Sequence, residues 1–152
     1  MTSVTQRAVL ENLNSMINLI LSQIAKSVEL QKKERNLIQV LCEELLINII
    51  RYAYDETGDM TVEVAVDKET SMIYLCFIDG GKAFNPLEKE KPDITADIME
   101  RPIGGMGIFM VREIADTIVY ERLGNLNKLT VSVSYEDGDN LQTKTGKSAN
   151  KN

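Results

Sequence analysis

The stretch 43-EELLINIIRYAY-54 has the composition of a buried helix, yet it places two polar side chains among apolar ones. A helix turns by about 100° per residue, so Glu44 and Asn48 stand one turn apart on the same face as Leu41 and Leu45. Burying a carboxylate without a partner is costly. The fold around this helix must therefore supply something polar for Glu44 and Asn48.

Two explanations of this polar pair remain open. In the first, Glu44 and Asn48 hydrogen-bond to each other at the edge of the core. In the second, they border a cavity that holds a polar ligand. The side-chain oxygen of an asparagine suits a hard cation such as Mg²⁺, and a glutamate one turn away can orient or deprotonate an attacking hydroxyl or water.

The helix is expected to run from about Arg35 to Tyr54, after a polar break at 31-QKKE-34. Its apolar side is expected to be formed by four side chains, which are Leu37, Leu41, Leu45 and Tyr52. An earlier helix is predicted within residues 11–30, where Leu13, Ile17 and Ile20 recur at helical spacing.

Length and charge set the broad class of the protein. A chain of 152 residues suits one domain with a substantial core. The net charge of −6 argues against a nucleic-acid partner, which usually meets a basic face. No apolar run has membrane-spanning length and no signal peptide is apparent, so we expect no membrane partner and a cytoplasmic protein.

The sequence contains no histidine, which removes the commonest general base and zinc ligand. Cys42 and Cys76 lack the spacing of a metal site, and we interpret both as small buried apolar residues. Any chemistry must therefore use carboxylates, amides, backbone groups or a hard metal ion.

Alternating apolar residues predict three strands with one apolar face, at 60-MTVEVAVD-67, 71-SMIYLCFID-79 and 128-KLTVSVSY-135. In the second strand, Asp79 shares a face with Leu75 and Phe77. In the third, Thr130 lies on the side opposite to Val131. This pattern is typical of an antiparallel sheet that is covered on one side only.

The whole chain predicts an α+β fold, a two-layer sandwich with helices packed on one face of a mixed or antiparallel sheet. Two further strands are expected, a short edge strand within residues 4–10 and another at residues 117–122. We expect a single domain over residues 1–135. Residues 136–152 are polar and are expected to form a disordered tail.

The segment from Gly80 to Arg101 shows neither the helical spacing nor the strand alternation of apolar residues. It is long for an ordinary connection, and such segments are typical of a lid or binding loop. It begins at 77-FIDGGKAF-84. Asp-Gly is a common hairpin signal, but no strand follows here. An inward-facing Asp79 can accept a hydrogen bond from an exocyclic amine such as that of adenine, and Gly81 permits close approach of a flat ring.

A second glycine cluster, 104-GGMGIFMV-111, directly precedes a predicted helix. Its backbone N–H groups could face an anion at the start of that helix, or the cluster could serve only as a hinge. The Lys-Ser/Thr of a Walker loop is missing.

Taken together, Glu44-x-x-x-Asn48, Asp79-x-Gly81 and Gly105-x-Gly107 resemble the N, G1 and G2 boxes of the GHKL (Bergerat-fold) ATPases. The likeness extends to about Tyr135. It is greatest to the stand-alone anti-sigma factor serine kinases, whose pattern is similar to 79-DGGKAFNP-86 and 125-NLNKLTVSVS-134.

The resemblance implies ATP and Mg²⁺ as cofactors and a role for each matching residue. Asn48 would bind Mg²⁺, and Glu44 would act as the general base or orient the nucleophile. Asp79 would bind the adenine amino group, with Gly81 beside the ring. Thr130 would support Asp79 or adenine through a water. Three residues would meet the phosphates at the hinge of the lid, namely Gly105, Met106 and Gly107, while Arg101 is a further candidate. Tyr52 stands where related proteins often carry a histidine.

The function implied by the resemblance is an anti-sigma factor that binds a sigma factor and phosphorylates a serine on a STAS-type anti-anti-sigma protein. A homodimer is also implied. Two alternatives remain open: a nucleotide-gated binding module without catalysis, and a detached catalytic domain of the histidine-kinase type that acts on a histidine of another protein.

Overall fold

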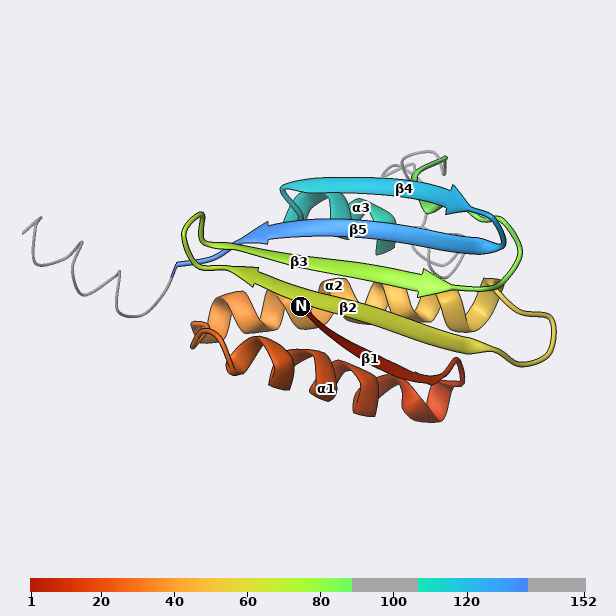
Figure 1. Ribbon diagram of the computed structural model, residues 1–152, viewed down its shortest axis with the longest axis horizontal. Helices are drawn as coiled ribbons and strands as arrows, with labels where there is room; N and C mark the ends of the chain where they lie inside the picture. Colours follow the sequence, from red (N-terminus) through yellow and green to blue (C-terminus); the bar gives the residue numbers. More distant parts are fainter. Residues whose placement is uncertain (89–106, 137–152) are drawn as a thin grey trace, which may run out of the picture.

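The computed structural model describes residues 1–88 and 107–136. Its centre is a five-stranded sheet in the order β1-β2-β3-β5-β4 (Figure 1). Every neighbouring pair of strands is antiparallel. The strands are β1 (Thr2–Arg7), β2 (Asp59–Asp67), β3 (Met72–Asp79), β4 (Thr117–Leu123) and β5 (Leu126–Ser134). The sheet is therefore antiparallel throughout.

The helices lie on one face of this sheet (Figure 1). They are α1 (Leu13–Ala25), α2 (Lys32–Tyr52) and α3 (Gly107–Ile114), with short 3-10 turns η1 (Leu10–Asn12) and η2 (Pro86–Glu88). α1 contacts β1 and β2, α2 contacts β2 and β3, and α3 packs against α2. No described helix covers the opposite face, so the predicted two-layer α+β sandwich is confirmed.

Alternation along the strands places the core between sheet and helices. In β3, Ile73, Leu75 and Phe77 are buried, and so are Val62 in β2 and Val131 in β5. These side chains meet the buried faces of α1 and α2, and burial of such apolar area is the main favourable contribution to folding. The same alternation carries Asp79, at the end of β3, onto the helix side of the sheet.

Helix α2 begins at Lys32, about one turn before the predicted start, so the interpretation of residues 31–34 as a break is wrong. The reason is a capping box. The backbone N–H of Gln31 donates to Glu34 Oε1 at 3.2 Å, while the Gln31 side chain accepts from the third residue of the helix. The buried stripe of α2 also differs from the expected one, because Leu37 is 40% exposed whereas Ile38 is fully buried.

The two cysteines lie in different surroundings. Cys42 of α2 is buried, as predicted, but Cys76 of β3 is half-buried and points to the uncovered face of the sheet. The interpretation of Cys76 as a core residue is therefore wrong.

The chain ends of the fold are only partly described. The backbone N–H of Glu136 donates to Glu34 Oε2 at 2.6 Å, which ties the end of β5 to the start of α2. The remainder of the predicted tail, residues 137–152, lies outside the described residues. Within the part of the chain that the structure describes, no helix is long and apolar enough to cross a membrane.

Candidate nucleotide site

Asp79 and Asn127 meet at the end of the sheet where β3 finishes and β5 begins. They are paired across the two strands, and both side chains are buried. Asn127 Nδ2 donates to Asp79 Oδ1 at 2.9 Å, and the backbone N–H of Gly81 donates to the same oxygen at 3.0 Å. One oxygen of the carboxylate is therefore held by two donors from the protein.

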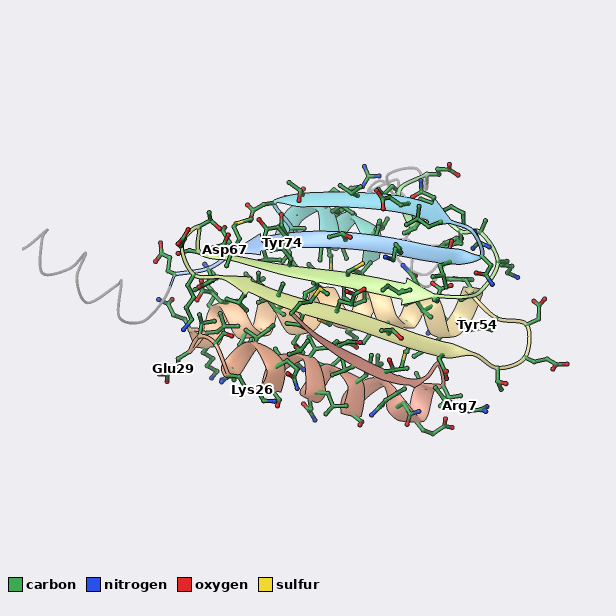
Figure 2. The ribbon with its side chains drawn as sticks, viewed as in Figure 1. Arg7, Lys26, Glu29, Tyr54, Asp67 and Tyr74 are labelled. Carbon is green, nitrogen blue, oxygen red and sulfur yellow. The ribbon has the colours of Figure 1, made fainter. Side chains whose placement is uncertain are left out.

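The backbone after Asp79 is held by the C-terminal end of α2. Tyr54 lies just beyond that helix, at the end of the sheet where β3 stops (Figure 2). Its hydroxyl accepts from the backbone N–H of Gly80 at 2.7 Å and donates to the backbone carbonyl of Asp59 at 2.6 Å. Tyr54 thereby joins the end of β3 to the start of β2.

Gly81 lies directly against Ala53, and a β-carbon at Gly81 would overlap the Ala53 carbonyl group. That carbonyl accepts from the backbone N–H of Lys82 at 2.9 Å, while the Gly81 carbonyl accepts from Arg122 Nη1 at 2.9 Å. Gly81 thus has a packing requirement of its own, separate from the contact with a ligand ring that the sequence suggested.

A pocket opens between α2 and the ends of β3, β4 and β5. It is lined by Leu45, Asn48, Ile49, Ala53, Phe77, Asp79, Phe84, Pro86, Tyr120, Asn127 and Leu129. Apolar walls with a few convergent polar groups are typical of small-molecule sites. The cavity volume is only about 30 Å³. Phe84, which stacks on Tyr52 with 5.5 Å between ring centroids, forms part of its wall. A planar ring therefore enters only if part of the pocket lining moves.

Asn48 lines this pocket with its side chain 9% exposed. Among the described residues, no hydrogen bond joins its amide to Glu44 or to any other side chain. The structure thus does not show the hydrogen-bonded pair that was one of the two explanations. An amide that lines a pocket and has no protein partner among the described residues is available to a ligand.

The donors at this site fit a magnesium–nucleotide complex better than a metal bound by protein alone. The amide oxygen of Asn48 is a hard donor of the type that Mg²⁺ accepts. The described part of the chain contains no group of three or more His, Cys, Asp or Glu side chains that could hold a metal. Mg²⁺ usually completes its shell with phosphate oxygens and waters, so a single protein ligand is sufficient.

Glu44 lies one turn before Asn48 and faces the first residue of α3. A β-carbon on Gly107 would overlap Glu44 Oε2, so any larger residue at this position would require the Glu44 side chain to shift. Partial burial raises the pKa of Glu44, repulsion from Glu43 raises it further, and Arg51 partly opposes both. The carboxylate is therefore a better proton acceptor than an exposed glutamate, and it lies beside the N-terminus of a helix.

The sequence-predicted residues are placed as follows. Asn48 and Asp79 line one pocket, Gly81 follows Asp79 on the adjoining loop, and Glu44 contacts Gly107 one turn of α2 away from Asn48. The candidates Gly105, Met106 and Arg101 lie outside the described residues, as does most of the predicted lid. Their roles stay predictions.

Thr130 does not reach Asp79, so the expectation that it would support this carboxylate is wrong. It is paired with Cys76 across β3 and β5, on the face of the sheet opposite to Asp79 and the pocket. Its hydroxyl donates to Cys76 Sγ at 3.4 Å. The residue of β5 that reaches Asp79 is Asn127.

Sequence reasoning missed Asn127 because it began the last strand at Lys128. β5 in fact starts at Leu126, and Asn127 continues the inward series of Leu129, Val131 and Val133. Side chains alternate between the two faces of a strand, so the inward position before Leu129 is Asn127. Extending the alternation to Asn127 would have placed its amide opposite Asp79. Tyr120, whose hydroxyl donates to Asn127 Oδ1, was also missed, because no sequence pattern pointed to it.

Known proteins show the same fold and family. The Histidine kinase-like ATPase domain profile matches residues 7–133. The serine/threonine-protein kinase BtrW of Bordetella bronchiseptica (strain ATCC BAA-588 / NCTC 13252 / RB50) is 24% identical over 93 residues, which cover 60% of this chain and 66% of BtrW. The chain therefore matches slightly less than two thirds of the length of BtrW.

Solved structures of histidine kinases share the fold at low sequence identity. The blue-light activated histidine kinase of Erythrobacter litoralis EL346 superposes with a TM-score of 0.55 and 15% identity, covering 81% of this chain and 42% of that one. The catalytic domain of histidine kinase ThkA gives a TM-score of 0.52 and 15% identity, with 90% and 99% of the two chains covered. Because the profile match spans most of the sequence, the chain belongs to the Histidine kinase-like ATPase domain family.

Proposed function

We propose that this protein binds Mg-ATP and transfers the γ-phosphoryl group to a serine of a STAS-type anti-anti-sigma protein, and that it also binds a sigma factor. The observation that carries the proposal is the placement of the Asn48 amide, which has no partner among the described residues, and of the inward Asp79 carboxylate on the walls of one apolar pocket. The serine/threonine-protein kinase name of the relative BtrW supports a protein hydroxyl as acceptor.

The Asp79 end of the pocket suits a purine. Oδ1 of Asp79 accepts from Asn127 and Gly81. Oδ2, which no described residue bonds, would accept a hydrogen bond from the exocyclic amine of adenine. Ile49 and Leu129 provide apolar wall on which the ring would pack. Segment 84–86 would move aside as the ring enters and then cover it.

The Asn48 end suits the phosphates. Asn48 would bind Mg²⁺ through its amide oxygen. The start of α3 at Gly107 presents backbone N–H groups, and a helix N-terminus favours negative charge. Gly105 and Met106, just before it in sequence, would add further contacts to the phosphates.

Glu44 is the group that would handle the proton of the acceptor serine. Bound Mg-ATP supplies the phosphoryl group and the positive charge that neutralises it during transfer. Partial burial raises the pKa of Glu44, which improves the carboxylate as an acceptor for the serine hydroxyl proton. Contact with Gly107 holds Glu44 beside the proposed phosphate site, and positioning of this kind contributes strongly to phosphoryl transfer.

The partner surfaces are proposed on the parts of the fold that no described helix covers. The open face of the sheet carries Tyr74 and Val119, both substantially exposed, and α1 carries the exposed Leu19. A sigma factor, the STAS-type protein or a second copy in a homodimer would use these surfaces. The nucleotide would decide between partners if the partners bind the ATP and ADP forms with different affinity.

The test is transfer of label from γ-labelled Mg-ATP to the purified STAS-type protein encoded nearest to this chain, followed by mapping of the labelled residue. We expect acid-stable phosphoserine, and little label with Glu44→Gln. ATP binding without transfer would instead support a nucleotide-gated binding module. Acid-labile label on a histidine would support the histidine-kinase alternative, and either result would contradict the serine-kinase proposal.

A further inference from the structure

Asn127 uses every hydrogen-bonding position of its side chain. Nδ2 donates to Asp79 Oδ1 at 2.9 Å and to the backbone carbonyl of Lys82 at 2.8 Å. Oδ1 accepts from the Tyr120 hydroxyl at 2.6 Å and from the backbone N–H of Phe84 at 3.3 Å. An asparagine amide offers two donors and two acceptor positions, so this side chain, only 4% exposed, is fully satisfied.

The orientation of the amide is fixed by backbone groups that can bond in one way only. The Lys82 carbonyl can only accept, so it must face Nδ2. The Phe84 N–H can only donate, so it must face Oδ1. A flipped amide would break both bonds, and Asp79 therefore always meets a donor.

The direction of this donor determines which oxygen of Asp79 remains for a ligand. Nδ2 of Asn127 and the N–H of Gly81 both donate to Oδ1, which prevents the carboxylate from rotating. Among the described residues no donor bonds Oδ2, so Oδ2 is the oxygen that a ligand can reach. Asn127 also holds the carbonyl of Lys82 and the N–H of Phe84, so the same amide fixes the start of the segment that forms the pocket wall.

We infer that Asn127 is a positioning residue for purine recognition, which acts by presenting Asp79 Oδ2 to the 6-amino group of the base. The inference rests on the proposed ATP site. A residue that merely supports the fold would affect all nucleotides alike, whereas a residue that acts through the contact between Asp79 and the amino group affects only ligands that carry this group.

The test compares two ligands that differ in this one group, Mg-ATP and the Mg complex of purine riboside 5′-triphosphate, which lacks the 6-amino group. Calorimetric titration of the wild type is expected to show about tenfold tighter binding of ATP, since a hydrogen bond to a charged acceptor contributes about this factor. In Asn127→Leu the preference is expected to fall to about twofold or less. A change in the pocket wall would weaken both ligands alike and would leave this ratio unaffected.

The matched control is Lys128→Ala, the next residue of β5, which points to the open face and is expected to keep the full preference. Asn127→Ala gives a second, smaller replacement if the leucine variant does not fold. Adding Asn127→Leu to Asp79→Asn is expected to weaken ATP binding little further, because both changes remove the same contact.

Folded Asn127 variants that keep the wild-type preference, or that lose affinity equally for both ligands, would overturn the inference alone. In that case the wild type would still bind ATP, and the proposed function would stand. A wild type that binds neither ligand would overturn the proposed function and the inference with it.

Discussion

The first residue of α3, Gly107, lies against the carboxylate of Glu44 in α2, and a β-carbon at position 107 would overlap Glu44 Oε2. The contact joins the helix that carries the polar pair to the helix that follows the second glycine cluster. It places the proposed proton acceptor beside the N-terminus of α3.

Gly107→Ala is expected to displace the Glu44 side chain and slow phosphoryl transfer by about tenfold to a hundredfold, because small errors of position are costly in such reactions. The overlapped atom is the end of a flexible side chain, so stability should change by less than about 1 kcal/mol. Single-turnover transfer and urea unfolding measure the two effects. An unchanged rate would show that this contact does not position Glu44 for chemistry.

Gly81→Ala, in contrast to Gly107→Ala, is expected to affect mainly the stability of the protein. Its β-carbon would overlap the backbone of Ala53, which cannot move alone. We expect a loss of about 1–3 kcal/mol in the free energy of unfolding. Gly80→Ala is the matched control, because its β-carbon would lie 3.7 Å from the Tyr54 hydroxyl, an ordinary contact. Equal stability of the two variants in urea unfolding would contradict the described packing of this loop.

Asn48→Leu is expected to change the free energy of unfolding of the ligand-free protein by less than about 1 kcal/mol, because the amide lines the pocket and has no hydrogen bond to lose among the described residues. The same change should abolish the rise in melting temperature caused by Mg-ATP. Thermal unfolding with and without Mg-ATP tests both effects. A variant that is destabilised by more than about 1 kcal/mol, or that keeps the full ligand-induced shift, would show that the amide has a structural rather than a ligand-binding role.

Glu44→Gln should make stability less dependent on pH. The pKa of Glu44 is raised in the folded state, mainly by burial, so the folded protein holds this proton more tightly than the unfolded chain. The resulting stability is present in acid and is lost as pH rises through the folded-state pKa. At neutral pH the glutamine variant should therefore melt about 1–3 °C higher, and the gain should vanish in acid. Glu56→Gln, an exposed change of equal charge, should show no such gain.

Thiol labelling tests the two faces of the sheet independently of any ligand. Burial raises the pKa of Cys42 to about 12, so its reactive thiolate is scarce as well as inaccessible. Cys76 is half-buried on the uncovered face. We expect the native protein to react first at Cys76, and Cys76→Ser to react only on unfolding. Rapid labelling of Cys42 in the folded protein would contradict the placement of α2.

The fold was largely predictable from sequence because its periods are clear. The series Ile73, Leu75 and Phe77 is buried as the alternation indicates, and Asp79 continues it to the end of β3. Helix boundaries were harder to predict. Gln31 is not among the side chains most favoured at a helix N-cap, so its capping box with Glu34 was read as a break.

The candidate site was predictable where a polar residue interrupted an apolar pattern, as Asn48 and Asp79 do. The prediction was wrong for Thr130, because its role was taken from the family resemblance. The alternation of side chains already placed Thr130 on the face of the sheet opposite to Val131. Leu37 was assigned to the buried stripe instead of Ile38, because neighbouring positions on a helix differ by only about 100° and both are apolar.

The central claim is a magnesium-dependent nucleotide site at the pocket formed by α2 and the ends of β3 and β5. Its most direct test is calorimetric titration of the folded wild type with ATP, with and without Mg²⁺. We predict one-to-one binding that requires Mg²⁺ and that is lost in Asn48→Ala. Absence of binding to the folded wild type, or equal binding by Asn48→Ala, would contradict the claim.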